Sequence, residues 1–397
     1  MATRRVFLKN SALALFGAGV APQWLARAAA GPGSRKILVA VLQRGAADGL
    51  NIVVPHGDKR YSELRPTIGI AREKVIDLDG FFGLHPQLEP LKPLYDAKQI
   101  AIVHATGSPD ATRSHFDAQD YMESGTPGLK STSDGWMNRA LAHETNPSPL
   151  RAVSASGNLA KTLRGPQAAV AIGNMSDFQV RDRKMASEYQ SMYAASSDAR
   201  LQTAGRETFE ALRMMESVRR ANPTPENGAV YPRGRLGQSL RQVAQLVKGN
   251  VGLEAAFADM GGWDHHTNEL PQMENQLREF GQALVAFQRD LGDRMEDVVV
   301  VTMSEFGRTA RENGTRGTDH GHANVMFAMG GGVHGGRVAG RWPGLEAEQL
   351  YEGRDLAVTT DFRDVLGEIV TTHLGRTDLG TVFPGFRPGA APGLFRG

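Results

Sequence analysis

The chain has 397 residues, of which 45 are lysine or arginine and 43 are aspartate or glutamate, and it contains no cysteine. The absence of cysteine excludes disulfides, thiolate metal ligands, a cysteine nucleophile and cysteine-bound iron–sulfur clusters. The charges are nearly balanced and form no basic run of the kind that binds nucleic acid, so we expect no nucleic-acid partner.

The first thirty residues have the pattern of a twin-arginine (Tat) export signal. Arg4 and Arg5 precede the short apolar run 12–20, and small residues then crowd the end of the segment. A charged start, an apolar stretch too short to span a bilayer and a small-residue end are typical of a secretory signal, and the paired arginines indicate the Tat route. We expect the Tat translocon to export the chain, cleavage near Ala28 or Ala30, and a periplasmic or secreted protein. The alternative is an ordinary amphipathic N-terminal helix.

Removal of this signal changes the charge of the chain. It takes away four basic residues and no acidic one, which leaves 41 basic against 43 acidic residues and a net charge of −2. No later apolar run reaches the length that spans a bilayer. We therefore expect residues 31–397 to form a single domain with no membrane span.

The mature sequence alternates strand-like and helix-like segments. Continuous apolar runs, typical of strands buried on both faces, occupy 37–42, 100–105, 168–172, 298–302 and 324–329. Apolar residues at helical spacing predict helices over 208–218, 236–247 and 273–291. This alternation predicts an α/β fold with a doubly wound, mostly parallel sheet flanked by helices. In such a fold, ligands bind beyond the carboxyl ends of the strands.

Acidic residues and histidines gather near the ends of these apolar runs. The candidate metal ligands are Asp48, Asp264, His265, His266, Glu305, Asp319, His320 and His322. Imidazole together with carboxylate suits a divalent cation, zinc first, with manganese, iron or calcium as alternatives. In an extended segment His320 and His322 project to the same side. His265 and His266 project oppositely, so only one of these two is expected to bind. Each histidine taken alone is equally typical of an ordinary core or surface position.

A second set of candidates could act on a substrate. Ser114 precedes a helical stretch that stops at Gly125, so its hydroxyl is either an N-cap or a nucleophile positioned to accept a phosphate or sulfate group. Arg113 and Arg308 could hold an anionic substrate, or they could form ordinary surface ion pairs. His115, if it stays outside the metal shell, could transfer a proton.

Several motifs of the chain together resemble one bacterial protein family. They are the Tat signal and the segments 44–51 (RGAADGLN), 114–117 (SHFD), 262–266 (GWDHH), 304–309 (SEFGRT) and 319–324 (DHGHAN). Their combination resembles domain-of-unknown-function family 1501, which is placed within the alkaline phosphatase and sulfatase superfamily. The resemblance extends over essentially the whole mature chain. It implies an α/β sandwich with metal ligands at strand ends that hydrolyses phosphate or sulfate esters.

The resemblance also implies roles for individual residues. Asp48 matches the first-strand aspartate ligand of the superfamily, and Ser114 falls near its nucleophile. Asp264 with either His265 or His266 matches the first Asp/His pair of ligands.

The later motifs match in part. Glu305 stands where the superfamily has a Ser-Asp-His-Gly motif, and His320 or His322 stands where it has a late histidine ligand. Phe306 replaces an expected histidine, so one metal is lost or held differently. The absence of cysteine removes the formylglycine of classical sulfatases.

The expected function is an exported metal-dependent hydrolase that acts on a small anionic ester or an anionic polymer. The alternative is a non-catalytic exported binding or assembly protein that keeps the fold, with or without a structural metal.

Overall fold

The computed structural model describes residues 35–141, 147–175, 183–221 and 224–395. The predicted Tat signal lies outside these residues. Within them, no helix is both long and apolar enough to cross a membrane.

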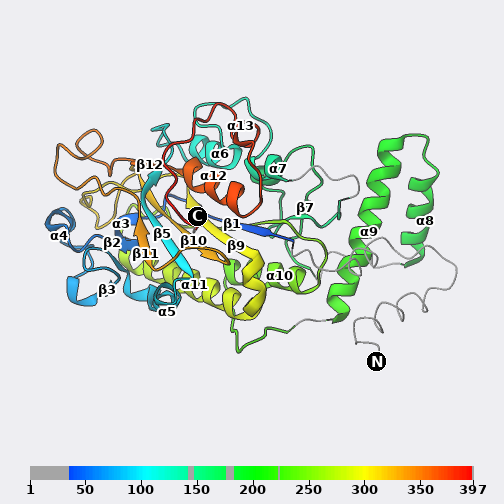
Figure 1. Cartoon of the computed structure of the whole chain (residues 1–397), viewed down its shortest axis with the longest axis horizontal. Helices are drawn as coiled ribbons and strands as arrows, with labels where there is room; N and C mark the ends of the chain where they lie inside the picture. The colour runs from blue at the N-terminus through cyan, green and yellow to red at the C-terminus, as the bar shows by residue number, and fades with distance from the viewer. Residues whose placement is uncertain (1–34, 142–146, 176–182, 222–223, 396–397) are drawn as a thin grey trace.

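A mixed, mostly parallel sheet of nine strands lies at the centre of the fold (Figure 1). Eight of the strands follow one another in the order β11 (Arg337–Ala339), β5 (Ile100–Gly107), β10 (Asn324–Gly330), β9 (Val298–Ser304), β1 (Ile37–Gln43), β8 (Ala255–Met260), β6 (Ala152–Ser154) and β7 (Val170–Ala171). The ninth, β12 (Thr360–Asp361), also pairs with β5. All pairings in this sheet are parallel except those of β10, which runs antiparallel to β5 and β9.

Helices cover both faces of this sheet, which is why its strands are apolar throughout. In β1, Val39 and Val41 belong to one core cluster and Leu38 and Leu42 to another. Helices α10 (Arg235–Lys248) and α11 (Glu269–Leu291) pack into the first cluster. Helices α7 (Trp136–Ala140), α12 (Phe362–Thr372) and α13 (Leu379–Val382) pack into the second, and Figure 1 shows the two sets on opposite sides of the sheet. The predicted fold class is therefore confirmed.

The predicted elements are present, and several of them have different bounds. β1, β5, β9 and β10 match four predicted strands, whereas the fifth, 168–172, is reduced to the two residues of β7. The three predicted helices are α9 (Ala199–Ala221), α10 and α11. Helix α8 (Arg183–Ala194) lies beside α9 (Figure 1).

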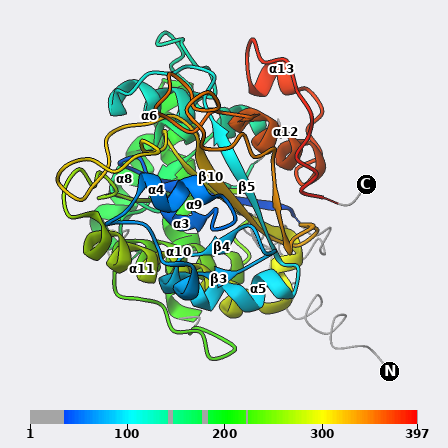
Figure 2. The same cartoon turned by 90° about the vertical axis from the view of Figure 1, so that its left-hand side faces the viewer.

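The chain between β1 and β5 forms a separate small sheet at one end of the molecule, which faces the viewer in Figure 2. Its strands are β2 (Val53–Val54), β4 (Gly83–Leu84) and β3 (Ile76–Asp77), and the helices of this segment are α3 (Gly49–Ile52), α4 (Lys59–Leu64) and α5 (Lys92–Asp96).

Candidate metal centre

The candidate residues meet at the carboxyl edge of the central sheet. The segments that follow β5, β8 and β9 carry His115, Asp264 and Glu305, and these three strands run in the same direction. Because β10 runs the opposite way, its amino end reaches the same edge and brings His320 there. An isolated antiparallel bridge then joins His320 to Arg308.

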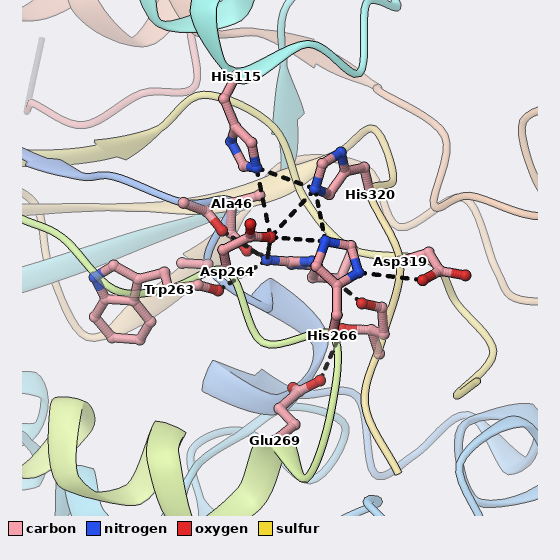
Figure 3. A network of polar contacts seen from close by, with 12 residues as sticks. Ala46, His115, Trp263, Asp264, His266, Glu269, Asp319 and His320 are labelled. Atoms are coloured by element: carbon pink, nitrogen blue, oxygen red, sulfur yellow. Dashed lines mark hydrogen bonds and ion pairs between the residues drawn. The ribbon is translucent and has the colours of Figure 1, made fainter. Parts of the chain in front are cut away.

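Three imidazoles and one carboxylate converge at this edge (Figure 3). His320 Nε2 lies 3.0 Å from Nε2 of His115 and 3.0 Å from Nε2 of His266. Asp264 Oδ1 lies 2.9 Å from Nε2 of His266, 3.2 Å from that of His320 and 3.4 Å from that of His115. Two ligands of one tetrahedral ion, with bonds of about 2 Å, are roughly 3.3 Å apart. Three residues have ligand atoms that all lie within 4.8 Å of one another and so suit a single metal ion, namely His115, Asp264 and His320. His266 lies beside Asp264 and His320, and we call these four residues the metal cluster.

The other nitrogen of each ring contacts a group that can only accept a hydrogen bond. Nδ1 therefore donates in each case, and a neutral ring then carries its lone pair at Nε2. The three bonds run from His115 to Glu305 Oε1 (2.8 Å), from His266 to Asp319 Oδ1 (3.2 Å) and from His320 to the backbone oxygen of Arg113 (2.9 Å). Lone pairs and a carboxylate oxygen that face one another repel unless a cation lies between them. Imidazoles oriented in this way by acceptors are the usual surroundings of a bound metal.

Arg308 fixes the position of the Asp264 carboxylate. Its Nη2 donates to Asp264 Oδ1 at 2.7 Å, and its guanidinium also donates to the backbone oxygens of Gly45, Ala46, Trp263 and Thr318. Burial raises the pKa of Asp264, but the hydrogen bond and charge of Arg308 outweigh it and lower the pKa to about 2. Asp264 is therefore a carboxylate at neutral pH, and Arg308 is too fully engaged to hold a substrate as well.

Glu305 is a buried residue that hydrogen-bonds to one histidine of the cluster. Its side chain is buried, and Oε1 accepts hydrogen bonds from the Gly45 N–H (2.7 Å), from His115 (2.8 Å) and from Gln119 (2.8 Å). Burial raises the pKa of Glu305, but these bonds outweigh it and leave the pKa below its usual value. The hydrogen bond to Glu305 also raises the pKa of His115.

His320 is the most central ligand-type residue of the cluster. Burial lowers its pKa, which favours the neutral ring that a metal requires. Its side chain is 23% exposed and that of Asp264 45%, so the cluster is open to solvent on one side.

Asp48 lies in a buried ion pair instead of the cluster. Its two oxygens accept from the guanidinium of Arg65, which also donates to the backbone oxygens of Thr309 and Ala310. Burial raises the pKa of Asp48, but Arg65 outweighs it and the pKa is lowered. Burial and the neighbouring Asp48 raise the pKa of Glu269 well above its usual value. The Thr318 hydroxyl donates to Glu269 Oε2 at 2.7 Å.

Two of the candidate histidines are buried outside the cluster. His265 is 2% exposed and lies against Trp263, and burial lowers its pKa to about 4. His322 contacts the backbone oxygen of Ser108 at 2.9 Å, and burial lowers its pKa as well. The sequence leaves two choices open, one between His265 and His266 and one between His320 and His322. The structure brings His266 and His320 to the cluster.

The residues at the start of α6 (His115–Ser124) have structural partners. Ser114 is the N-cap of α6, and its hydroxyl accepts the N–H of Asp117 at 3.4 Å. Arg113 pairs with Asp355 (2.6 Å) and Glu352 (2.7 Å). His115 has both nitrogens engaged, which suits a ligand and not a proton carrier.

Sequence reasoning did not find Gln119, Arg65 or Glu269. Gln119 stands four residues after His115, a helical spacing that places both on one face of α6, and this was the available signal. Nothing local in the sequence indicates that Arg65 pairs with Asp48.

The fold and the cluster together define an α/β protein with a candidate site for one divalent metal at the carboxyl edge of its sheet. A family model described as "Protein of unknown function (DUF1501)" matches residues 101–382. The chain belongs to this family. The comparison with curated proteins finds no match.

Several solved structures are similar at low identity. Lipoteichoic acid synthase LtaP from Listeria monocytogenes is 10% identical with a TM-score of 0.32, and the match covers 75% of this chain and 65% of that one. A protein in the alkaline phosphatase superfamily from Vibrio parahaemolyticus is 11% identical with a TM-score of 0.33, and the match covers 76% and 61%. PsFucS1 sulfatase from Pseudoalteromonas sp. is 11% identical with a TM-score of 0.33, covering 83% and 68%. Likenesses this low say nothing of the activity of this chain.

Proposed function

We propose that this protein is an exported, metal-dependent hydrolase of phosphate or sulfate esters. The observation that carries the proposal is the convergence of three Nε2 atoms and Asp264 Oδ1, each ring oriented through Nδ1 by an acceptor. Export through the Tat translocon is part of the proposal and depends on residues 1–30 alone.

The cluster would hold the metal through His115, His320 and Asp264, with His266 beside them as a further donor. Three imidazoles and one carboxylate favour zinc, with manganese and iron as alternatives. When bound, such an ion polarises an ester and offsets the negative charge that develops on it.

The surrounding residues have separate tasks in this proposal. Arg308 orients Asp264, and Glu305 orients His115. Ser114 precedes His115 directly, and its oxygen accepts a hydrogen bond as a cap without using its own proton. The hydroxyl therefore remains available as a nucleophile, which is the role that the family resemblance implies for it.

A second candidate function is non-catalytic binding with a structural metal. The presence of His266 beside the other three donors favours it, because structural zinc sites are usually closed by four protein ligands. The exposure of Asp264 and His266 favours the catalytic proposal, since their side chains are 45% and 41% exposed. His266→Ala separates the two. A catalytic centre should keep its metal with three ligands and change its activity, whereas a structural centre should lose metal and stability together.

The primary test compares the purified mature protein with His320→Ala and with a control, His334→Ala. His334 is half-buried and lies outside the cluster. We expect about one metal ion per wild-type chain by elemental analysis, with hydrolysis of 4-nitrophenyl phosphate or 4-nitrophenyl sulfate. Both should be lost in His320→Ala and kept in His334→Ala. A wild-type protein that binds no divalent metal would refute the proposal.

A further inference from the structure

A polar cavity lies at the same edge of the central sheet as the metal cluster. It has a volume of about 250 Å³. Its lining includes Arg44, which follows β1, Asp259 near the end of β8, and residues 156–161, which follow β6. The carboxyl ends of parallel strands are where ligands bind in this class of fold. We call this space the arginine cavity.

The charged lining of the arginine cavity favours an anion. Its basic residues are Arg44, Lys161, Arg164 and Arg235, and its acidic residues are Glu123 and Asp259. Both acidic side chains are already paired with Arg44, at 2.8 and 2.9 Å.

Two arginines of the cavity use only some of their N–H groups in contacts with the described residues. Arg235 shares Asp259 with Arg44 through one nitrogen, at 2.8 Å, and its side chain is 61% exposed. Arg164 is exposed and donates its Nε to the backbone oxygen of Leu159, but it forms no ion pair with the residues that the structure describes. Guanidinium groups with free donors are suited to phosphate and sulfate.

One face of α6 connects the arginine cavity to the metal cluster. His115, Gln119 and Glu123 stand four residues apart, so they line the same face of this helix. Gln119 donates to Glu305 and accepts from Arg44, both at 2.8 Å, and Glu123 also accepts from Arg44. Eight residues of α-helix rise about 12 Å. The cavity wall at Glu123 is therefore on the order of 12 Å from the ligand His115 along the helix.

We infer that the arginine cavity binds a second anionic group of the same molecule whose ester lies at the metal cluster. The substrate class is then an elongated oligomer or polymer with repeated phosphate or sulfate groups. A small ester with a single anionic group reaches only the cluster. This inference rests on the proposed function, because the cluster must hold one end of the molecule.

The test uses non-hydrolysable α,ω-alkane bisphosphonates as a ruler. A series from ethane to dodecane is titrated calorimetrically into the metal-loaded protein, with the alkyl monophosphonates of equal length as a reference for chain hydrophobicity. We expect an affinity maximum, on the order of tenfold over the matched monophosphonate, at one intermediate chain length, because the second group then binds intramolecularly. The maximum should vanish in Arg164→Gln/Arg235→Gln. It should persist in Arg233→Gln, which removes an exposed arginine outside the cavity lining.

The outcomes separate this inference from the proposed function. Monophosphonates that bind only with metal present, without a length maximum for the bisphosphonates, would overturn the second subsite and leave the hydrolase standing. A maximum that survives in Arg164→Gln/Arg235→Gln would also overturn it, because the second group then lies elsewhere. A protein that binds neither metal nor monophosphonate at the cluster refutes both.

Discussion

His115 donates through Nδ1 to the buried carboxylate of Glu305 at 2.8 Å, which leaves its Nε2 facing Asp264 and His320. Carboxylates behind a ligating imidazole fix its tautomer and raise its basicity. Glu305 is in turn held by the N–H of Gly45 and by Gln119. The cluster is thus oriented by groups that would not touch the metal.

Replacing Glu305 should weaken metal binding without removing a ligand. Glu305→Gln keeps the size of the side chain but loses the charge that supports His115, so we expect metal affinity to fall about 10- to 100-fold. Chelator competition with zinc measures this change. Asp319→Asn is the matched control, because Asp319 supports His266 from a side chain that is 58% exposed, and its effect should be smaller. Equal effects of the two variants would contradict the role given to Glu305.

Phe116 should contribute to substrate binding and not to stability. This side chain directly follows His115 of the metal cluster. It is 90% exposed, so its packing contributes little to the stability of the fold. Phe116→Ala should change the unfolding free energy by less than about 0.5 kcal/mol. We expect it to raise KM several-fold with unchanged metal content, because an exposed aromatic residue next to a cluster histidine in the chain can cover the body of a substrate. Val230→Ala, at an 81% exposed position, is the control and should leave KM unaltered.

The proposed export signal can be tested separately from the proposed hydrolytic activity. Tat recognition depends on the paired arginines, so Arg4→Lys/Arg5→Lys should leave the uncleaved precursor in the cytoplasm. Fractionation followed by mass measurement of the chain shows the location and the cleavage site, expected near Ala28 or Ala30. Lys9→Arg leaves the pair intact and serves as the control. Unimpaired export of the Arg4→Lys/Arg5→Lys protein would favour a different route.

Stability should fall as the pH is lowered from neutral, and His104 should account for part of the loss. His104 is buried, donates to the backbone oxygen of Val53 and accepts the N–H of Ala105, and burial lowers its pKa to about 4. Below about pH 6.5 the unfolded chain binds a proton that the folded chain rejects, so the contribution declines between about pH 6.5 and 4, by up to about 3 kcal/mol. Urea unfolding across this range measures the change. His104→Gln cannot titrate and should show a correspondingly flatter pH dependence.

The sequence predicts the buried strands well because a strand covered on both faces is apolar at every position. It does not predict strand direction, because an apolar run such as 324–329 is the same whichever way the strand lies. The antiparallel course of β10 is what brings His320 to the cluster. The choice between His265 and His266 was left open for a similar reason, since it depends on which side of the loop packs against Trp263.

The partner of Asp48 could not be predicted from its position in the sequence. Its place after the first strand matches a ligand of the superfamily, yet in this chain Arg65, seventeen residues later, takes both of its oxygens. That pairing depends on how α4 and the loop at 309–310 pack together, and no local pattern encodes it.

Removing Arg65 tests this account of Asp48. Arg65→Met leaves a buried carboxylate without its cation, so we expect the unfolding free energy to fall by about 3–5 kcal/mol. Asp48→Asn/Arg65→Met removes both charges and should be more stable than Arg65→Met alone. Because neither residue belongs to the metal cluster, the double variant should retain about the same metal content as the wild type in elemental analysis. Loss of metal in a folded double variant would mean that Asp48 is a ligand after all and that Arg65 gives way to the ion.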